Sequence, residues 1–217
     1  MHETNLSGGR EKVMSKLVSP RRKPPARMLT RSQVAAAVQR MAAPKGTERF
    51  AAGKAVAATA DRAPDRVYPH FTTIAALLDG DCKIVRWNAV QTLGALAGVD
   101  APRQIDGVLD KLLSFIRCGQ LVSAANAIGA LGRIMRHRPD LVDAILPSLL
   151  RVQQETFETP ECRNVIAGQA LNVLEDLWDD LRARPGVMEF VRQQQRNPRP
   201  AVARRAAALA ASRSGCG

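Results

Sequence analysis

Aromatic residues are scarce in this chain, at only 4% of its 217 residues. The core must therefore be built mainly from Ala, Leu, Val and Ile. Such a composition favours close-packed helices over a β-sandwich, because Ala and Leu are good helix formers whereas strands favour β-branched and aromatic residues. Long apolar runs are missing too. No segment approaches the roughly 18 apolar residues of a membrane span, and the N-terminus lacks the apolar run of a secretory signal. We therefore expect no membrane association.

Cysteine pairs and catalytic motifs are also absent. The four cysteines lie far apart, without a CxxC pair or a histidine at zinc-finger spacing. We interpret them as reduced thiols of a cytoplasmic protein: Cys82, Cys118, Cys162 and Cys216. Neither a glycine-rich phosphate loop nor an HExxH or GxSxG motif occurs. The sequence therefore predicts a protein that is not an enzyme and binds no cofactor or metal.

Positive charge is abundant and unevenly distributed. The formal net charge is +12, and residues 1–46 contain ten basic and two acidic side chains, which places +8 there and leaves +4 for the rest. Residues 1–29 combine this charge with little apolar surface, so we predict a disordered basic arm. Residues 213–217 are predicted to be a flexible tail.

Basic residues near the two ends are candidate contacts for a polyanion: Arg21, Arg22, Lys23 and Arg27 in the arm, with Arg204 and Arg205 near the C-terminus. Such clusters neutralise phosphates without regard to sequence. Their alternative role is to solubilise the arm and to provide a polar cap on the last repeat. No aromatic residues are interleaved with them to stack on single-stranded bases.

A helical pattern begins after the arm. Val34, Ala37, Val38 and Met41 recur at i, i+3, i+4 and i+7 and share one helix face, and Pro44 follows them. Residues 30–46 are therefore predicted to form a short capping helix and a linker.

The remaining chain repeats itself with a period near 38 residues. Leu93-Gly94 recurs as Leu131-Gly132, and Asn88 falls on Asn126 under the same offset. Prolines recur at similar intervals and suit a first helical turn, where their missing N–H leaves no bond unmade. These are Pro64, Pro102, Pro139 and Pro185. The spacing predicts first helices over about 47–62, 83–97, 121–137 and 160–181. Second helices are expected over about 65–78, 102–117, 139–152 and 185–195, followed by a half unit over 200–212.

Two segments carry a resemblance to a known family. The stretch Val85-Arg86-Trp87-Asn88-Ala89, followed by Leu93-Gly94, resembles the first helix of a HEAT repeat, and Leu146-Pro147-Ser148-Leu149-Leu150 resembles its second helix. The turn Asp and the inner Arg of the family are present only in part, as Asp61 or Asp65 and Asp140. The resemblance implies an all-α fold over residues 47–212, an α-α superhelix of about four to four and a half HEAT-like helical hairpins. It says little about function, because this fold serves many.

One enzymatic subfamily of this fold can be compared residue by residue. HEAT-fold DNA glycosylases use groove tryptophans, a catalytic Asp and phosphate-binding Arg or Lys. Here Trp87 is followed one turn later by Gln91, and Trp178 by Arg182, so neither has an Asp at that spacing. Base excision is therefore not supported by the residues.

Polar positions on the predicted second helices lie off the apolar stripes and are expected on a concave surface. They are Tyr68, Arg103, Asp106, Asp110, Arg117, Asp143 and Arg151. This mixture of Asp and Arg suits a protein or peptide partner better than a polyphosphate backbone, which the aspartates repel. We therefore predict a scaffold or adaptor that binds a protein or peptide. The alternative is a nucleic-acid or polyanion-binding protein that uses the arm and the C-terminal helix.

An acidic cluster surrounds Trp178: Glu175, Asp176, Asp179 and Asp180. On a continuous helix over 160–181 these residues form like-charged pairs at i, i+4 near the C-terminal end, and both features are unfavourable. The cluster is either a solvated helix end offset by neighbouring arginines, or a docking patch for a basic segment such as the protein's own arm. A metal site there lacks an assisting histidine and the spacing of an ion loop.

Overall fold

The computed structural model describes residues 28–212, and all regular structure in that range is helical. The predictions for residues 1–27 and 213–217 lie outside the described residues. They include most of the basic arm, the flexible tail, Cys216 and the candidate contacts Arg21, Arg22, Lys23 and Arg27. Within residues 28–212 no helix is long and apolar enough to cross a membrane.

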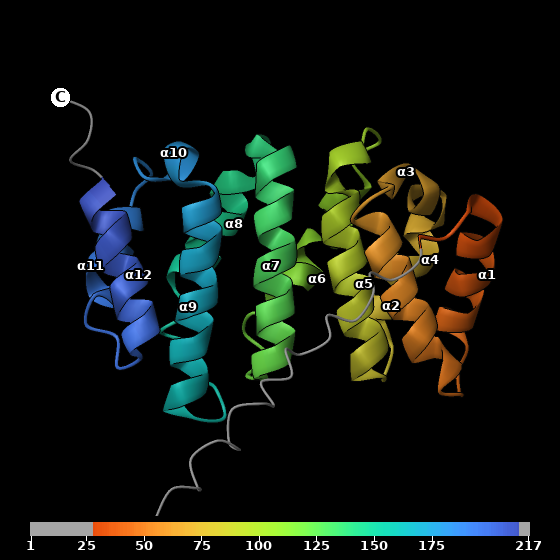
Figure 1. Cartoon of the computed structure of the whole chain (residues 1–217), viewed down its shortest axis with the longest axis horizontal. Helices are drawn as coiled ribbons and strands as arrows, with labels where there is room; N and C mark the ends of the chain where they lie inside the picture. Colours follow the sequence, from red (N-terminus) through yellow and green to blue (C-terminus); the bar gives the residue numbers. More distant parts are fainter. Residues whose placement is uncertain (1–27, 213–217) are drawn as a thin grey trace, which may run out of the picture.

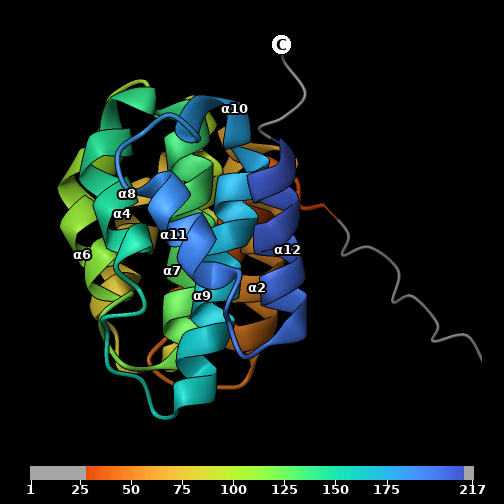
Figure 2. The ribbon, with the colours of Figure 1, turned by 90° about the vertical axis from the view of Figure 1, so that its left-hand side faces the viewer.

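The helices form two layers along the long axis of the molecule (Figures 1 and 2). The first layer is a row of the longer helices: α1 (Arg31–Ala42), α2 (Glu48–Ala60), α5 (Lys83–Leu96), α7 (Leu121–His137), α9 (Pro160–Asp176) and α12 (Pro200–Ala211). The second layer lies behind it in Figure 1 and contains shorter helices: α3 (Pro64–Val67), α4 (Phe71–Ala76), α6 (Leu109–Ser114), α8 (Val142–Leu150) and α11 (Val187–Gln194). The core lies between the layers.

The first-layer helices begin where the sequence supplies a cap. The Thr30 hydroxyl accepts a hydrogen bond from the backbone N–H of Gln33, whose side chain in turn accepts from the backbone of Thr30, a capping box. Thr159 caps α9 through the N–H of Cys162, and Pro160 occupies its first position. The predicted helix over 121–137 is confirmed.

Positions that align under the spacing of about 38 residues in the sequence share the same burial. Ala89, Ala127 and Ala167 are all fully buried, as are Leu93, Leu131 and Leu171. Small residues also let neighbouring helices of the first layer approach closely. A Cβ added to Gly94 of α5 would lie 2.6 Å from the Cα of Ala130 on α7, and one added to Gly132 would lie 2.8 Å from Val173 on α9. The same relation holds for Gly53 with Asn88 and for Gly168 with Val202.

The second layer is more irregular than predicted. Its expected helices are broken into α-helical and 3-10 pieces: Tyr68–His70, Leu77–Asp79, Gln104–Val108 and Pro139–Leu141 are 3-10 turns, and Ala97–Val99 is another at the end of α5. Pro64 and Pro139 do begin helical segments, whereas Pro102 lies in a turn and Pro185 precedes α11. At Pro102 the next residue, Arg103, adopts a left-handed conformation (φ 59°), so the chain cannot enter a helix there.

The predicted helix over 160–181 is also divided. Helix α9 ends at Asp176, and α10 (Trp178–Leu181) starts two residues later. Leu177 between them has φ −123° and ψ 27°, outside the helical region, and its side chain is buried together with that of Leu181. Burial of these two leucines therefore outweighs the helical propensity of the segment.

Candidate functional site

A buried arginine that the sequence analysis did not single out, Arg138, gathers three carboxylates at the turns between the layers. Its Nη1 lies 3.5 Å from Asp100, and its Nη2 lies 2.7 Å from Asp106 and 2.8 Å from Asp140. Arg103 adds exposed ion pairs to Asp106 at 3.1 Å and to Asp140 at 2.7 Å. Arg103 and Asp106, predicted to face a partner, are thus already paired within the chain.

The electrostatics of this cluster favour the ionised forms of Asp106 and Asp140. The hydrogen bond from Arg138 lowers the pKa of Asp140 to about 2, more than desolvation raises it. The same guanidinium lowers the pKa of Asp106, with a smaller contribution from Arg103. The hydrogen bond to Asp140 in turn raises the pKa of Arg138. The arrangement is that of a structural network that joins the second unit to the third.

Tyr68 belongs to the same network. Its hydroxyl donates to Oδ1 of Asp100 at 2.6 Å and accepts from Nε2 of Gln104 at 3.0 Å. Burial and the hydrogen bond to Asp100 raise the pKa of Tyr68. Asp100 also accepts from the backbone N–H groups of Gln104 and Ile105, at 2.8 and 3.0 Å. The Tyr68 hydroxyl is therefore engaged inside the molecule.

The other predicted second-helix residues are exposed but do not form one site. Asp110 and Arg117 lie on and just after α6. Asp143 forms an ion pair with Arg184 at 2.9 Å. Asp143 and Arg151 line a hollow of about 440 Å³ between α8 and the turn before α11, with apolar lining from Leu146, Pro147 and Leu150.

The predicted acidic cluster is divided by the break at Leu177. The expectation of like-charged pairs on one continuous helix is wrong, because Asp179 and Asp180 lie in the separate α10. Glu175 pairs with Arg205 of α12 at 3.0 Å, and Asp176 lies 3.9 Å from Arg136 of α7. Glu175 and Asp176 therefore connect neighbouring first-layer helices, while Asp179 and Asp180 are exposed.

The two C-terminal basic candidates also differ in whether they pair within the chain. Arg204 is exposed on α12, whereas Arg205 pairs with Glu175 and also bonds to the side chain of Asn172.

A groove that the sequence analysis did not predict runs across the first layer. It has a volume of about 770 Å³ and is lined by α2, α5, α7, α9 and the turns that follow them. It extends from Ala60, Asp61 and Pro64 at one end to Asp176 and Leu177 at the other. We call it the first-layer groove. It lies on the outer face of the first layer, away from the second layer. The sequence predicts the binding surface on the second helices instead.

Small residues line the middle of the first-layer groove: Ala95 of α5, Gly98 after it and Gly129 of α7. A Cβ on Gly98 would meet the ring of His137 at 3.3 Å, but one on Gly129 would meet nothing within 4 Å. Gly129 is thus an exposed glycine in the middle of a 17-residue helix, and no packing contact requires it. Relative to Ala it destabilises the helix by about 0.5–1 kcal/mol.

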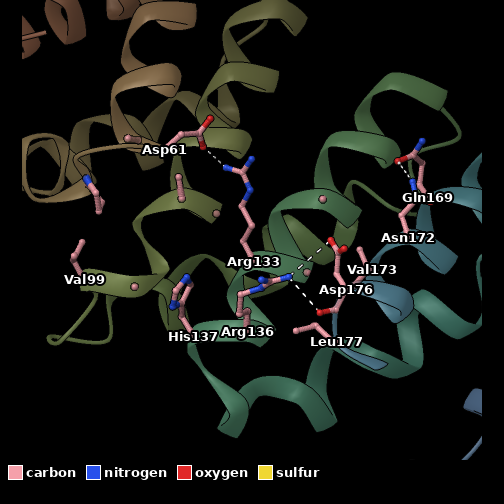
Figure 3. A pocket seen from close by; sticks show the side chains of 17 residues that line it. Asp61, Val99, Arg133, Arg136, His137, Gln169, Asn172, Val173, Asp176 and Leu177 are labelled. Atoms are coloured by element: carbon pink, nitrogen blue, oxygen red, sulfur yellow. Dashed lines mark hydrogen bonds and ion pairs between the residues drawn. The ribbon is translucent and has the colours of Figure 1, made fainter. Parts of the chain in front are cut away.

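Charged and amide side chains surround these small residues. Arg133 and Arg136 extend from α7 toward different partners, Arg133 toward Asp61 and Arg136 toward Asp176 (Figure 3). Helix α9 contributes Gln169 and Asn172 to the lining, and Nδ2 of Asn172 donates to Oε1 of Gln169 at 3.5 Å. The groove therefore offers both signs of charge and amides that can donate and accept.

Two of the missed features left a signal in the sequence. Gly129 interrupts an otherwise helical pattern near its centre, which costs stability and calls for a packing or binding explanation. Arg138 falls on Asp100 under the 38-residue offset, so opposite charges occupy equivalent turns of adjacent units. Neither signal specifies which side chains meet, because that depends on how the units pack.

Within residues 28–212 no group of three or more His, Cys, Asp or Glu side chains is arranged to hold a metal ion. No protein-family model matches the chain, and comparison of its sequence with curated proteins gives no match.

Proposed function

We propose that this chain is a HEAT-type helical-repeat scaffold, without enzymatic activity, that binds a polypeptide segment in the first-layer groove. The observation that supports this proposal is the exposed glycine at the centre of the groove. Gly129 has open space at its missing Cβ and weakens its own helix. A glycine in such a place has a role if another backbone must approach α7 closely.

The dimensions of the groove suit a polypeptide. It is lined by four consecutive first-layer helices. Adjacent packed helices are about 9 Å apart, so three spacings give about 27 Å, the length of about eight residues of extended chain. A small molecule would occupy only part of that length.

The polar groups suit a polypeptide better than a polyphosphate. Asp61 and Asp176 at the two ends of the groove offset the charges of Arg133 and Arg136, so the groove lacks the excess of positive charge that a polyphosphate requires. The amide of Gln169 carries a donor and an acceptor, which is what a peptide backbone presents in return, whereas the carbonyl of Asn172 already accepts from Arg205. The exposed ion pair of Arg133 with Asp61 is worth little to stability and is easily exchanged for a partner's charge.

Free thiols are typical of proteins in a reducing compartment such as the cytoplasm. Cys82, Cys118 and Cys162 are free thiols, and we propose that the protein acts in the cytoplasm.

A peptide-display library tests the groove directly, with two glycine variants as a matched pair. Gly129 and Gly107 both have nothing within 4 Å of an added Cβ, but Gly107 lies in the second layer, outside the groove. Peptides selected on the native chain are expected to bind Gly107→Gln unchanged and Gly129→Gln at least about tenfold more weakly, which is about 1.4 kcal/mol. The proposal is contradicted if the selected peptides bind both variants equally, or if the library yields no peptide that binds the native chain.

A further inference from the structure

The chain enters the described structure at the end of the first-layer groove. The backbone N–H of Leu29 donates to the hydroxyl of Thr59 at 3.2 Å, and the Leu29 carbonyl accepts from Nη1 of Arg66 at 3.0 Å. Thr59 is adjacent in sequence to Ala60 and Asp61, which line one end of the groove. In Figure 2 the first described residues, in red, emerge on the side of α12, the side of the first layer. Residue 29 is therefore fixed, and the segment before it starts beside the groove.

That preceding segment carries charge suited to the exposed acids near the groove. Residues 1–27 contain seven basic and two acidic side chains, a net charge of +5. Asp61 at the near end and Asp176 at the far end form exposed ion pairs with Arg133 and Arg136, which basic side chains of the segment can exchange, and Asp179 and Asp180 lie exposed beyond them in α10. The C-terminal ends of α2, α7 and α9, which carry partial negative charge, also lie beside the groove.

The distances agree with this charge pattern. Arg21, Arg22 and Lys23 precede residue 28 by five to seven positions, a reach of at most about 17–25 Å. Helices α7 and α9 follow α2 by two and three helix spacings, about 18 and 27 Å. A chain that leaves Leu29 along the groove can thus bring its Arg-Arg-Lys run over α7 and toward Asp176.

We propose that residues 1–27 bind across the first-layer groove as an intramolecular ligand and compete there with the polypeptide partner. This inference rests on the proposed function and adds its regulation. Tethering strengthens the case, because a short linker gives an effective concentration in the millimolar range, so modest affinity suffices for occupancy. A partner must therefore displace the arm, and removing the arm's charge favours the partner.

The test uses full-length chains and a fluorescently labelled synthetic peptide of residues 1–27, titrated at low salt. In the native chain the tethered segment competes with the probe. In a chain with Arg21→Glu, Arg22→Glu and Lys23→Glu the groove is free. We expect the probe to bind the charge-reversed chain at least tenfold more tightly than the native chain. Adding Gly129→Gln to the charge-reversed chain is expected to abolish this binding, whereas adding Gly107→Gln is not.

Four results would overturn the inference. They are a probe that binds neither chain, a probe that binds both equally, binding that survives Gly129→Gln, and a concentration-dependent dimer of the native chain that disappears with charge reversal. The last would mean that the arm occupies a second copy. If display-selected peptides still depend on Gly129 while the probe does not bind, this inference fails and the proposed function stands. If the selected peptides bind Gly129→Gln unchanged, the proposed function itself fails.

Discussion

Asp61 and Arg133 form an ion pair between the end of α2 and α7, although 72 positions separate them in sequence. Helix α5 lies between these two helices in the row (Figure 1). The pair therefore closes over the small residues of α5 and shapes one end of the first-layer groove. Both side chains are about half exposed, at 48% and 47%.

That exposure leads to the first prediction. The coupling energy between Asp61→Asn and Arg133→Gln in a double-mutant cycle is expected to be below about 1 kcal/mol, because exposed pairs gain little in water. Urea unfolding of the native chain, both single variants and the double variant measures it. Coupling of several kcal/mol would show that the pair is structural rather than a feature of the groove surface.

Two glycines of the first layer are expected to respond in opposite directions to the same substitution. Gly94→Ala places a Cβ 2.6 Å from Ala130 Cα and is expected to destabilise the chain by about 1–3 kcal/mol through overpacking. Gly129→Ala meets nothing within 4 Å and is expected to stabilise it by about 0.5–1 kcal/mol through helix propensity. Urea midpoints of the two variants give the comparison. A loss of stability in Gly129→Ala would mean that the helix is packed on that side.

Removing the central arginine is expected to be severe. Arg138→Met leaves the carboxylate of Asp100, whose side chain is 0% exposed, without its charged partner, and should cost about 3–5 kcal/mol. Arg103→Met touches the same cluster from its exposed side and should cost less than about 1 kcal/mol. Thermal or urea unfolding of both variants separates the two roles. Similar losses in the two would show that burial does not distinguish them.

The same network predicts acid sensitivity. The pKa of Asp140 is lowered in the folded chain to about 2, and that of Asp106 is lowered too. Between about pH 4 and pH 2 the unfolded state therefore binds more protons than the folded state, so stability falls as pH falls through this range. In Asp140→Asn the unfolding free energy should fall less steeply with pH in this range, because up to roughly one proton fewer is taken up on unfolding. An unchanged slope below pH 4 would contradict the ion pairing.

The alternative, nucleic-acid binding, makes a prediction about salt. If the basic arm binds duplex DNA, the logarithm of affinity falls with that of salt at a slope of about −0.9 per phosphate neutralised. Deleting residues 1–27 removes seven basic residues and spares the bonds of Leu29. We expect weak binding without sequence preference that is lost on this deletion. Duplex affinity that survives both physiological salt and the deletion would favour the alternative function.

How far the sequence predicted the structure differs between the layers. Helix α7 was predictable to its ends, because apolar residues recur at helical spacing and Gly119 and Pro139 flank it. The break at Leu177 was not, since local propensity favours helix there and only the burial of Leu177 and Leu181 explains the turn.

The candidate site was less predictable than the fold. Tyr68 and Asp106 occupy polar positions off the apolar stripes, as expected. Their partners Asp100 and Arg138 come from turns that are each 32 positions away in sequence. Periodicity predicts which residues leave the core. It does not predict whether they meet solvent or another unit. The pattern therefore predicts Tyr68 on a partner surface, whereas its hydroxyl bonds to Asp100 of the same chain.

The polar network also sets how the molecule comes apart. Arrays of repeated hairpins held only by contacts between neighbours lose their end units one at a time. Here Tyr68 of the first hairpin and Arg138 at the turn of the third both bond to Asp100 of the second. Opening any of these three hairpins removes a bonding partner from a buried carboxylate, so they are expected to unfold as one cooperative block. The fourth hairpin and α12 share none of these bonds, so they are expected to open at lower free energy and to exchange their amide hydrogens with solvent before the three linked hairpins do.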